Sequence, residues 1–154
     1  NILRSGNKKA AAFTLFFDMF KGFLAVLIAS YIDKDLVYVA ILSVVFGHIF
    51  PVYLLFKGGK GVATFLGALL SYSSVVGSLT LLTWIAVFYF TKKSSVAGIS
   101  SIVLSNFFLF LFCDNISIKF SVLLLSIVIL FKHLENIKRL LKKEELSFGG
   151  HDEN

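Results

Sequence analysis

The stretch AAAFTLFFDMFKGFLAVLIASYI, residues 10–32, decides the fold class of this chain. A helix that crosses a membrane needs about 20 predominantly apolar residues, and this run is long enough. Only Asp18 and Lys21 interrupt it, and ionisable side chains inside a span are costly unless they pair or face a polar cavity. Because they are three positions apart on one helical face, we expect them to pair with each other.

The composition of the whole chain also favours a membrane protein. Of its 154 residues, 57% are hydrophobic, and the mean hydropathy is +0.87, whereas soluble domains are about 45–50% apolar. The net charge of +6 does not indicate nucleic-acid binding, because the cations fall between apolar runs and not on one polar face. The single cysteine, Cys113, excludes an internal disulfide and a cysteine zinc site.

Further apolar runs follow the first one. They predict an all-α, polytopic transmembrane helical bundle with six spans, at Ala10–Ile32, Leu36–Leu55, Val62–Val76, Ser78–Thr91, Ser94–Phe112 and Ile116–Phe131. No stretch between the spans is large enough for a second domain. We therefore expect residues 1–149 to form a single transmembrane domain and residues 150–154 to form a polar C-terminal tail.

The basic residues predict how the chain lies in the membrane. With six spans, all four basic clusters fall on one side, which the positive-inside rule makes cytoplasmic. The clusters are Arg4/Lys8/Lys9, Lys57/Lys60, Lys92/Lys93 and Lys132/Lys138/Arg139/Lys142/Lys143. Both termini of this chain are then expected to be cytoplasmic.

The segment from Gly47 to Thr64 carries the most informative pattern for chemistry. It contains Gly-His-Ile-Phe-Pro and then Phe-Lys-Gly-Gly-Lys-Gly-Val-Ala-Thr, directly before a predicted span. Glycines permit close approach of a ligand, and the start of a helix offers unpaired N–H groups that suit an anion. The pattern predicts a phosphate site around Lys60, although a basic loop that only sets the topology is the alternative. The glycine spacing differs from a Walker motif, and no strand precedes it.

Two other polar segments flank the spans. Near the exit of the last span, helical spacing brings His133, Asn136 and either Lys138 or Arg139 onto neighbouring positions. His and Asn side chains can orient a hydroxyl, and Arg can clamp a phosphate. The alternative is an amphipathic basic tail on anionic lipid. The N-terminal Asn1-Ile2-Leu3-Arg4 would by itself be only a positive-inside anchor.

Together these segments resemble the motifs of the PlsY family, the bacterial integral-membrane acyl-phosphate:glycerol-3-phosphate acyltransferases. Residues 1–22 resemble the last part of the first family motif, Gly-Ala-Thr-Asn-x-x-Arg and its lysine-rich continuation. The second motif is matched from Gly47 to Thr64, and the third, His-x-x-Asn-Ile-x-Arg-Leu, from His133 to Leu140. The resemblance extends to about Gly149.

The resemblance implies a fold of seven transmembrane helices, so six spans here correspond to a chain that lacks the first helix and the serine- and glycine-rich start of the first motif. In the third motif, Lys143 stands where the family usually has glycine, and Glu145 stands at the acidic position. The family location is the bacterial cytoplasmic (inner) membrane, with the motif loops on the cytoplasmic side.

The resemblance also implies an activity. The protein would transfer a fatty acyl group from acyl phosphate to glycerol 3-phosphate and give lysophosphatidic acid, the first step of bacterial phospholipid synthesis. No metal or redox cofactor is implied. The catalytic residues would be His133, Asn136 and Lys60, with His133 or the leaving phosphate taking the hydroxyl proton. The phosphate-binding residues would be Arg4, Lys57, Gly58, Gly59, Lys60, Gly61 and Arg139, with secondary roles for Asn1, His48 and Glu145.

Two alternative functions belong to other classes. In the first alternative, the chain is an inactive, truncated remnant of such an enzyme. In the second, it is a transporter of an anionic solute. The basic loops and the charges at Asp18 and Lys21 motivate the transporter. Transporters often contain internal repeats and helices broken near the bilayer midplane, and the sequence has no visible repeat.

Overall fold

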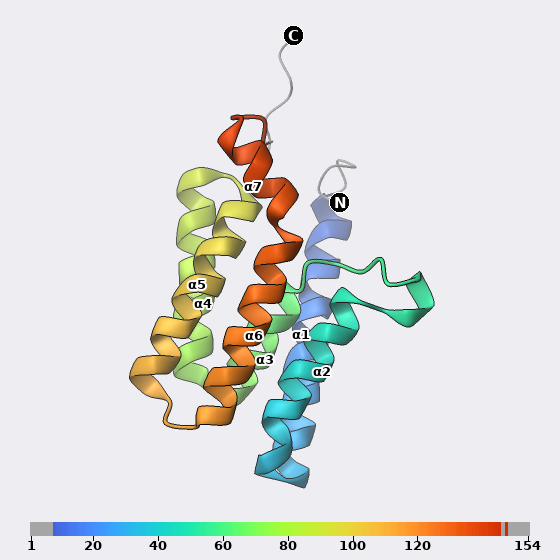
Figure 1. Cartoon of the computed structure of the whole chain (residues 1–154), viewed down its shortest axis with the longest axis vertical. Helices are drawn as coiled ribbons and strands as arrows, with labels where there is room; N and C mark the ends of the chain where they lie inside the picture. Colours follow the sequence, from blue (N-terminus) through green and yellow to red (C-terminus); the bar gives the residue numbers. More distant parts are fainter. Residues whose placement is uncertain (1–7, 146, 148–154) are drawn as a thin grey trace.

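The computed structural model describes residues 8–145 and 147, and the described chain is built from helices (Figure 1). In order they are α1 Lys8–Ile32, α2 Val37–Ile49, α3 Val62–Tyr72, α4 Ser74–Thr91, α5 Ser94–Phe112, α6 Ile116–Lys132 and α7 Leu134–Leu141. Short 3-10 turns at Lys34–Leu36 and Val52–Leu54 flank α2. The predicted all-α class is confirmed.

The helices differ in their ability to cross a bilayer. Four segments are long and apolar enough on their own, at Lys9–Ile32, Lys34–Leu54, Ser74–Thr91 and Ser94–Phe112. The pair α6–α7 qualifies only as a whole, and it bends by 55°. The remaining apolar helix, α3, has 11 residues. All six predicted segments are therefore helical, but helix length supports four or five full spans in the described chain, not six.

The helices depart from the predicted spans at two points, each for a local reason. The second candidate span reaches Leu54, close to the predicted Leu55, but its regular α-helix ends at Ile49. It ends there because the residue before Pro51 is disfavoured in the helical region, and Phe50 adopts φ −126° and ψ 57°. The third and fourth spans meet at Ser73, earlier than predicted. Its backbone is extended, with φ −144° and ψ 110°, and its Oγ accepts a hydrogen bond of 3.3 Å from the Val76 N–H, which caps α4.

The start of α3 is recessed along the bundle. The helices α3 and α4 meet at Ser73, and α4 has 18 residues whereas α3 has only 11. The first residue of α3 therefore lies about 10 Å short of the far end of α4. Glycines let α3 approach α1 closely: a methyl at Gly22 would collide with the Thr64 carbonyl, and one at Gly67 with the Met19 carbonyl. The first turn of α3 therefore lies partway down α1 (Figure 1).

The interior of the bundle is apolar, and so is much of its outer surface. Fully buried side chains include Ile41 and Val45 of α2, Phe65 of α3, and Leu125 of α6. Large hydrophobic side chains are also exposed along the helices, for example Phe110, which is 72% exposed. Such a surface is suited to hydrocarbon and not to water.

The basic segments gather at one end of the bundle. The chain between α2 and α3, the turn between α4 and α5, and helix α7 all lie toward the end where α1 begins (Figure 1). The turns after α1, α3 and α5 lie at the opposite end. We call the first end the motif end, because the second and third sequence motifs meet there.

Candidate active site

The glycine loop, residues 57–61, brings the second motif to the first turn of α3. Gly61 caps the helix with φ +91°, a left-handed conformation that side chains with a Cβ adopt only with strain. Its carbonyl accepts the first helical hydrogen bond, from the Phe65 N–H at 2.9 Å. The loop thus places Lys60 two residues before the first residue of α3, Val62, where unpaired N–H groups and the positive end of the helix dipole attract anions.

A chain of polar contacts joins the glycine loop to α7. The Lys60 ammonium donates to Oδ1 of Asn136, and Nδ2 of Asn136 donates to Glu145 Oε1 over 2.7 Å. The other carboxylate oxygen of Glu145 accepts from Arg139 Nε, also at 2.7 Å. We call these four residues the polar chain. It holds two cations and one carboxylate together, so it carries a net positive charge that suits a phosphate.

Glu145 is the anionic centre of the polar chain. Its side chain is only 7% exposed. Burial alone would raise the pKa of this carboxyl, but the nearby Ser95 hydroxyl, the Arg139 guanidinium and the Asn136 amide lower the pKa to about 2. Glu145 is therefore ionised at neutral pH, and it fixes the side-chain orientations of Asn136 and Arg139.

His133 lies at the junction of α6 and α7 and is 2% exposed. Its Nδ1 is 2.8 Å from the Ile129 carbonyl oxygen, which can only accept, so Nδ1 carries the hydrogen and donates it. The neutral ring then keeps its lone pair on Nε2. That atom faces Gly98 of α5 and the start of α3, since a methyl at Gly98 would lie 3.4 Å from Nε2 and 3.3 Å from a Val62 methyl.

The structure brings most of the predicted site residues to the motif end. Lys60, Asn136 and Arg139 share the polar chain with Glu145, and Gly61 begins the adjacent helix. Lys57 is exposed and makes no side-chain hydrogen bond or ion pair within the described chain, so it stands apart from them. Two predicted residues, Asn1 and Arg4, lie outside the described residues.

Two parts of this region were missed from the sequence. The first is the start of α5, where buried Ser95 lies beside Glu145 and Gly98 lies beside His133. In the sequence this part is marked by the run of mostly small residues Ser94-Ser95-Val96-Ala97-Gly98, which follows the pair Lys92-Lys93. Small residues are also typical of helices that pack closely. The sequence therefore gave no reason to separate a site contribution from packing.

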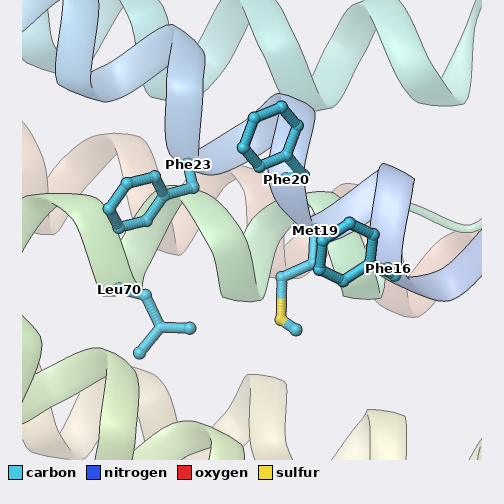
Figure 2. A pocket seen from close by; sticks show the side chains of 5 residues that line it. All are labelled: Phe16, Met19, Phe20, Phe23 and Leu70. Carbon is cyan, nitrogen blue, oxygen red and sulfur yellow. The ribbon is translucent and has the colours of Figure 1, made fainter.

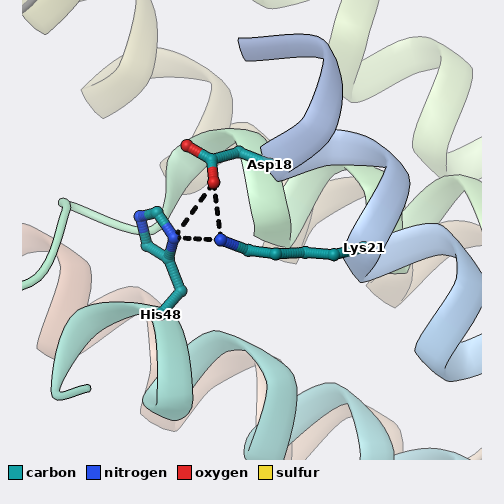
Figure 3. Close-up of polar contacts among 3 residues, drawn as sticks. All are labelled: Asp18, Lys21 and His48. Atoms are coloured by element: carbon teal, nitrogen blue, oxygen red, sulfur yellow. Dashed lines mark hydrogen bonds and ion pairs between the residues drawn. The ribbon is translucent and has the colours of Figure 1, made fainter. Parts of the chain in front are cut away.

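The second missed feature is that His48 joins the predicted Asp18–Lys21 pair. The Lys21 ammonium donates to Asp18 Oδ1 over 2.5 Å, as predicted, and also lies 2.6 Å from Nδ1 of His48 on α2 (Figure 3). The same Nδ1 is 3.4 Å from Asp18 Oδ1. We call these three residues the α1–α2 cluster. Its charges are paired, which accounts for ionisable groups inside a span.

Two surface pockets are unsuited to phosphate. Figure 2 shows an apolar pocket of about 150 Å³ between α1 and α3. Its lining is Phe16, Met19, Phe20, Phe23 and Leu70. A larger pocket of about 450 Å³ lies between α2 and α6, at the end opposite the motif end, where Tyr38 and Ile116 line it. Neither contains a cation in its lining, so the polar chain is the better candidate for an anion.

Known proteins resemble this chain over nearly its whole length. The profile of a family described as glycerol-3-phosphate acyltransferase matches residues 1–143. A glycerol-3-phosphate acyltransferase of Paraburkholderia phymatum is 42% identical, with 97% of this chain and 74% of that protein aligned. One of Ruthia magnifica is 43% identical, over 94% of this chain and 75% of that protein.

Solved structures give the same result. The crystal structure of PlsY (YgiH), an integral membrane glycerol 3-phosphate acyltransferase, in its glycerol 3-phosphate form has a TM-score of 0.90 and 35% identity. The alignment covers 97% of this chain and 76% of that one. Its lysophosphatidic acid form has a TM-score of 0.88 at the same identity.

Proposed function

Because this chain belongs to the glycerol-3-phosphate acyltransferase family, we propose that it transfers a fatty acyl group from an acyl phosphate to glycerol 3-phosphate, with the polar chain as its phosphate site. The observation that carries the site assignment is the contact between Lys60 and Asn136, which joins the second motif to the third. The chain is a multi-pass membrane acyltransferase, and glycerol 3-phosphate is its acceptor.

The proposed reaction exchanges one acyl–oxygen bond for another. A hydroxyl oxygen of glycerol 3-phosphate attacks the acyl carbonyl carbon, a new ester bond forms, and the bond to the phosphate oxygen breaks. The products are lysophosphatidic acid and inorganic phosphate. The hydroxyl proton passes either to Nε2 of His133, whose lone pair is available, or to the departing phosphate.

The cations of the polar chain support the binding of phosphate. Lys60 provides a positive charge at the helix start, and Arg139 uses Nε for Glu145, which leaves its terminal Nη groups to donate to an anion. Fixed donors of this kind stabilise the negative charge that develops as phosphate leaves. Arg4 and the backbone N–H groups of the glycine loop remain predicted contributors.

The acyl chain belongs to the lipid side of the site. The helices expose many large apolar side chains, and the start of α3, beside the proposed phosphate site, is recessed from the far end of α4. A donor held among the helices keeps its hydrocarbon in the bilayer while its phosphate reaches the polar chain. A water-filled acyl pocket is not required.

The same arrangement supports a proposed location in the cell. The basic segments share the motif end, and the positive-inside rule supports a cytoplasmic position for that end in a bacterial inner membrane. Glycerol 3-phosphate, a polar metabolite, then reaches the site from the cytoplasm. The transporter alternative loses its main support, because the charges of Asp18 and Lys21 are already paired.

The proposed function is tested by acyl transfer from acyl phosphate to labelled glycerol 3-phosphate in membranes that contain this chain. We expect transfer by the wild type and at least a hundredfold loss in Lys60→Ala and Asn136→Ala, because each removes half of the contact between the motifs. Lys34→Ala is the control, since Lys34 is exposed at the opposite end. Wild-type rates in the two site variants would reject the site, and no transfer by inserted wild type would reject the activity.

A further inference from the structure

The α1–α2 cluster lies directly beside the glycine loop. Asp18 and Lys21 reach from α1 toward His48 of α2, and the imidazole stands between this pair and the chain that leads to α3 (Figure 3). His48 is mostly buried, with 13% of its side chain exposed. Its position therefore affects both the helix pair behind it and the loop in front of it.

The hydrogen-bond chemistry of the cluster determines how the His48 ring is oriented. An ammonium group has donors only, so the 2.6 Å contact with Lys21 requires His48 Nδ1 to accept. In this arrangement the ring hydrogen is on Nε2. Asp18 completes the arrangement, because its carboxylate accepts a second hydrogen from Lys21 and holds the ammonium in place.

The opposite edge of the His48 ring contacts the glycine loop. A methyl at Gly59 would collide with Nε2 and would lie 2.8 Å from Cε1 and 3.2 Å from Cδ2, so the ring packs against the bare backbone of this residue. A methyl at Gly58 would collide with the His48 carbonyl oxygen. The side chain and the main chain of His48 thus determine the backbone positions of Gly58 and Gly59, the two residues that precede Lys60.

We propose that the α1–α2 cluster is a positioning device for the acyl transfer reaction, in which Asp18 and Lys21 fix the His48 ring and the ring sets the position of Lys60 through Gly59. The inference rests on the proposed function for its kinetic consequence. Lys60 must reach both Asn136 and a phosphate, and a displacement of about 1 Å in such a group can reduce a rate by up to a hundredfold.

The test separates the loop contact from helix packing. His48→Asn keeps an acceptor at the position of Nδ1 for Lys21 but removes the ring atoms that face Gly59. We expect a rise of about tenfold in KM for glycerol 3-phosphate, with the amount of inserted protein and the melting temperature unchanged. Gly47→Ala is the matched control, because a methyl at this neighbouring position meets nothing within 4 Å.

A double-mutant cycle tests the contact itself. Gly59→Ala alone should raise KM, because its methyl collides with the His48 ring. In the double variant with His48→Asn the ring atoms are gone, so the combined effect should be well below the product of the two single effects. Multiplicative effects, or a wild-type KM in His48→Asn, would overturn the proposal.

Hydrogen exchange provides a readout that does not depend on activity. In His48→Asn we expect the amides of residues 58–61 to exchange faster while those of α1 and α2 keep their protection. Unchanged exchange in the loop, or faster exchange throughout α1 and α2, would overturn the positioning role. An inactive wild type would reject the proposed function separately, and the exchange result would still decide whether His48 holds the loop.

Discussion

Replacement of Glu145 by glutamine tests whether its carboxylate holds the polar chain together. In the wild type its two oxygens accept hydrogen bonds of 2.7 Å from Asn136 and Arg139. Glutamine has nearly the same shape, but it offers one acceptor and one donor. The donor must then face another donor, either the Asn136 amide or the Arg139 guanidinium, so the substitution removes one bond and creates a repulsive contact.

The depressed pKa and the hydrogen bonds that cause it give similar magnitudes for the effect. A fall of the Glu145 pKa from 4.5 to about 2 corresponds to roughly 3 kcal/mol in favour of the folded state. A hydrogen bond to a charged group is worth about 1.5–3 kcal/mol. Because Arg139 is partly exposed and solvent screens its charge, we take about 2 kcal/mol as the expected loss. For a protein of this size that lowers the melting temperature by about 4–8 °C.

The single cysteine supplies the assay. Cys113 is buried, so a thiol-reactive dye should label purified protein in detergent only as it unfolds. Glu144→Gln is the matched control, because the neighbouring side chain is exposed and makes no side-chain hydrogen bond or ion pair within the described chain. Equal melting temperatures for Glu145→Gln and Glu144→Gln would refute the assigned role of the carboxylate.

The pH dependence gives a second test of the same prediction. The folded pKa of Glu145 is depressed, so its contribution is fully present above the unfolded pKa of about 4.5 and is lost as pH falls toward about 2. The difference in melting temperature between wild type and Glu145→Gln should therefore be constant between about pH 7 and 6. It should shrink below about pH 4.5. A difference that grows on acidification would contradict the linkage.

Three further substitutions test other parts of the site. Gly61→Ala should lower both activity and melting temperature, at a cost of about 1–3 kcal/mol, because Gly61 has φ +91°; Gly47→Ala, compared in the same assays, should change neither. His133→Asn keeps a donor near the position of Nδ1 but removes Nε2. If His133 is the general base, kcat should fall by about 10²–10⁴ with little change in KM. An unchanged kcat would indicate that the departing phosphate accepts the proton. Gly67→Val should reduce the amount of folded protein recovered in detergent, because its side chain would collide with the main chain of α1, and normal recovery would contradict the close α1–α3 contact.

The parts of the fold that could be predicted from the sequence are those set by local pattern. Apolar runs predicted six helical segments, and the spacing of Asp18 and Lys21 predicted their ion pair. Helix ends were less accurate. Hydropathy continues through Phe50 and Ser73, whereas the helices end there because of a following proline and a capping serine. Hydrophobicity sets how much chain can be buried, but backbone geometry sets where each helix stops.

The contacts of the site could not be predicted in the same way. Lys60 and Asn136 are 76 residues apart, and their contact depends on the bend between α6 and α7 and on the short α3. His48 meets Lys21 across 27 residues for a similar reason, since α2 must pack against α1 with the right rotation. The motifs predicted which residues form the site. Only the packing of helices shows which of them touch.

The short α3 connects the fold to its chemistry. A full-length helix would place its first turn, and Lys60 beside it, at the membrane surface, where phosphate is accessible but an acyl chain would have to leave the hydrocarbon. With 11 residues, α3 is only about 16 Å long, whereas a hydrocarbon core is roughly 30 Å thick, so we propose that the start of α3 lies at a depth that lipid tails can reach. Charges at that depth must be paired, and Glu145 and the α1–α2 cluster provide the pairing on either side of the glycine loop. Under the proposed function, the recessed helix start would let a water-soluble acceptor and a lipid-soluble donor meet at one group of side chains.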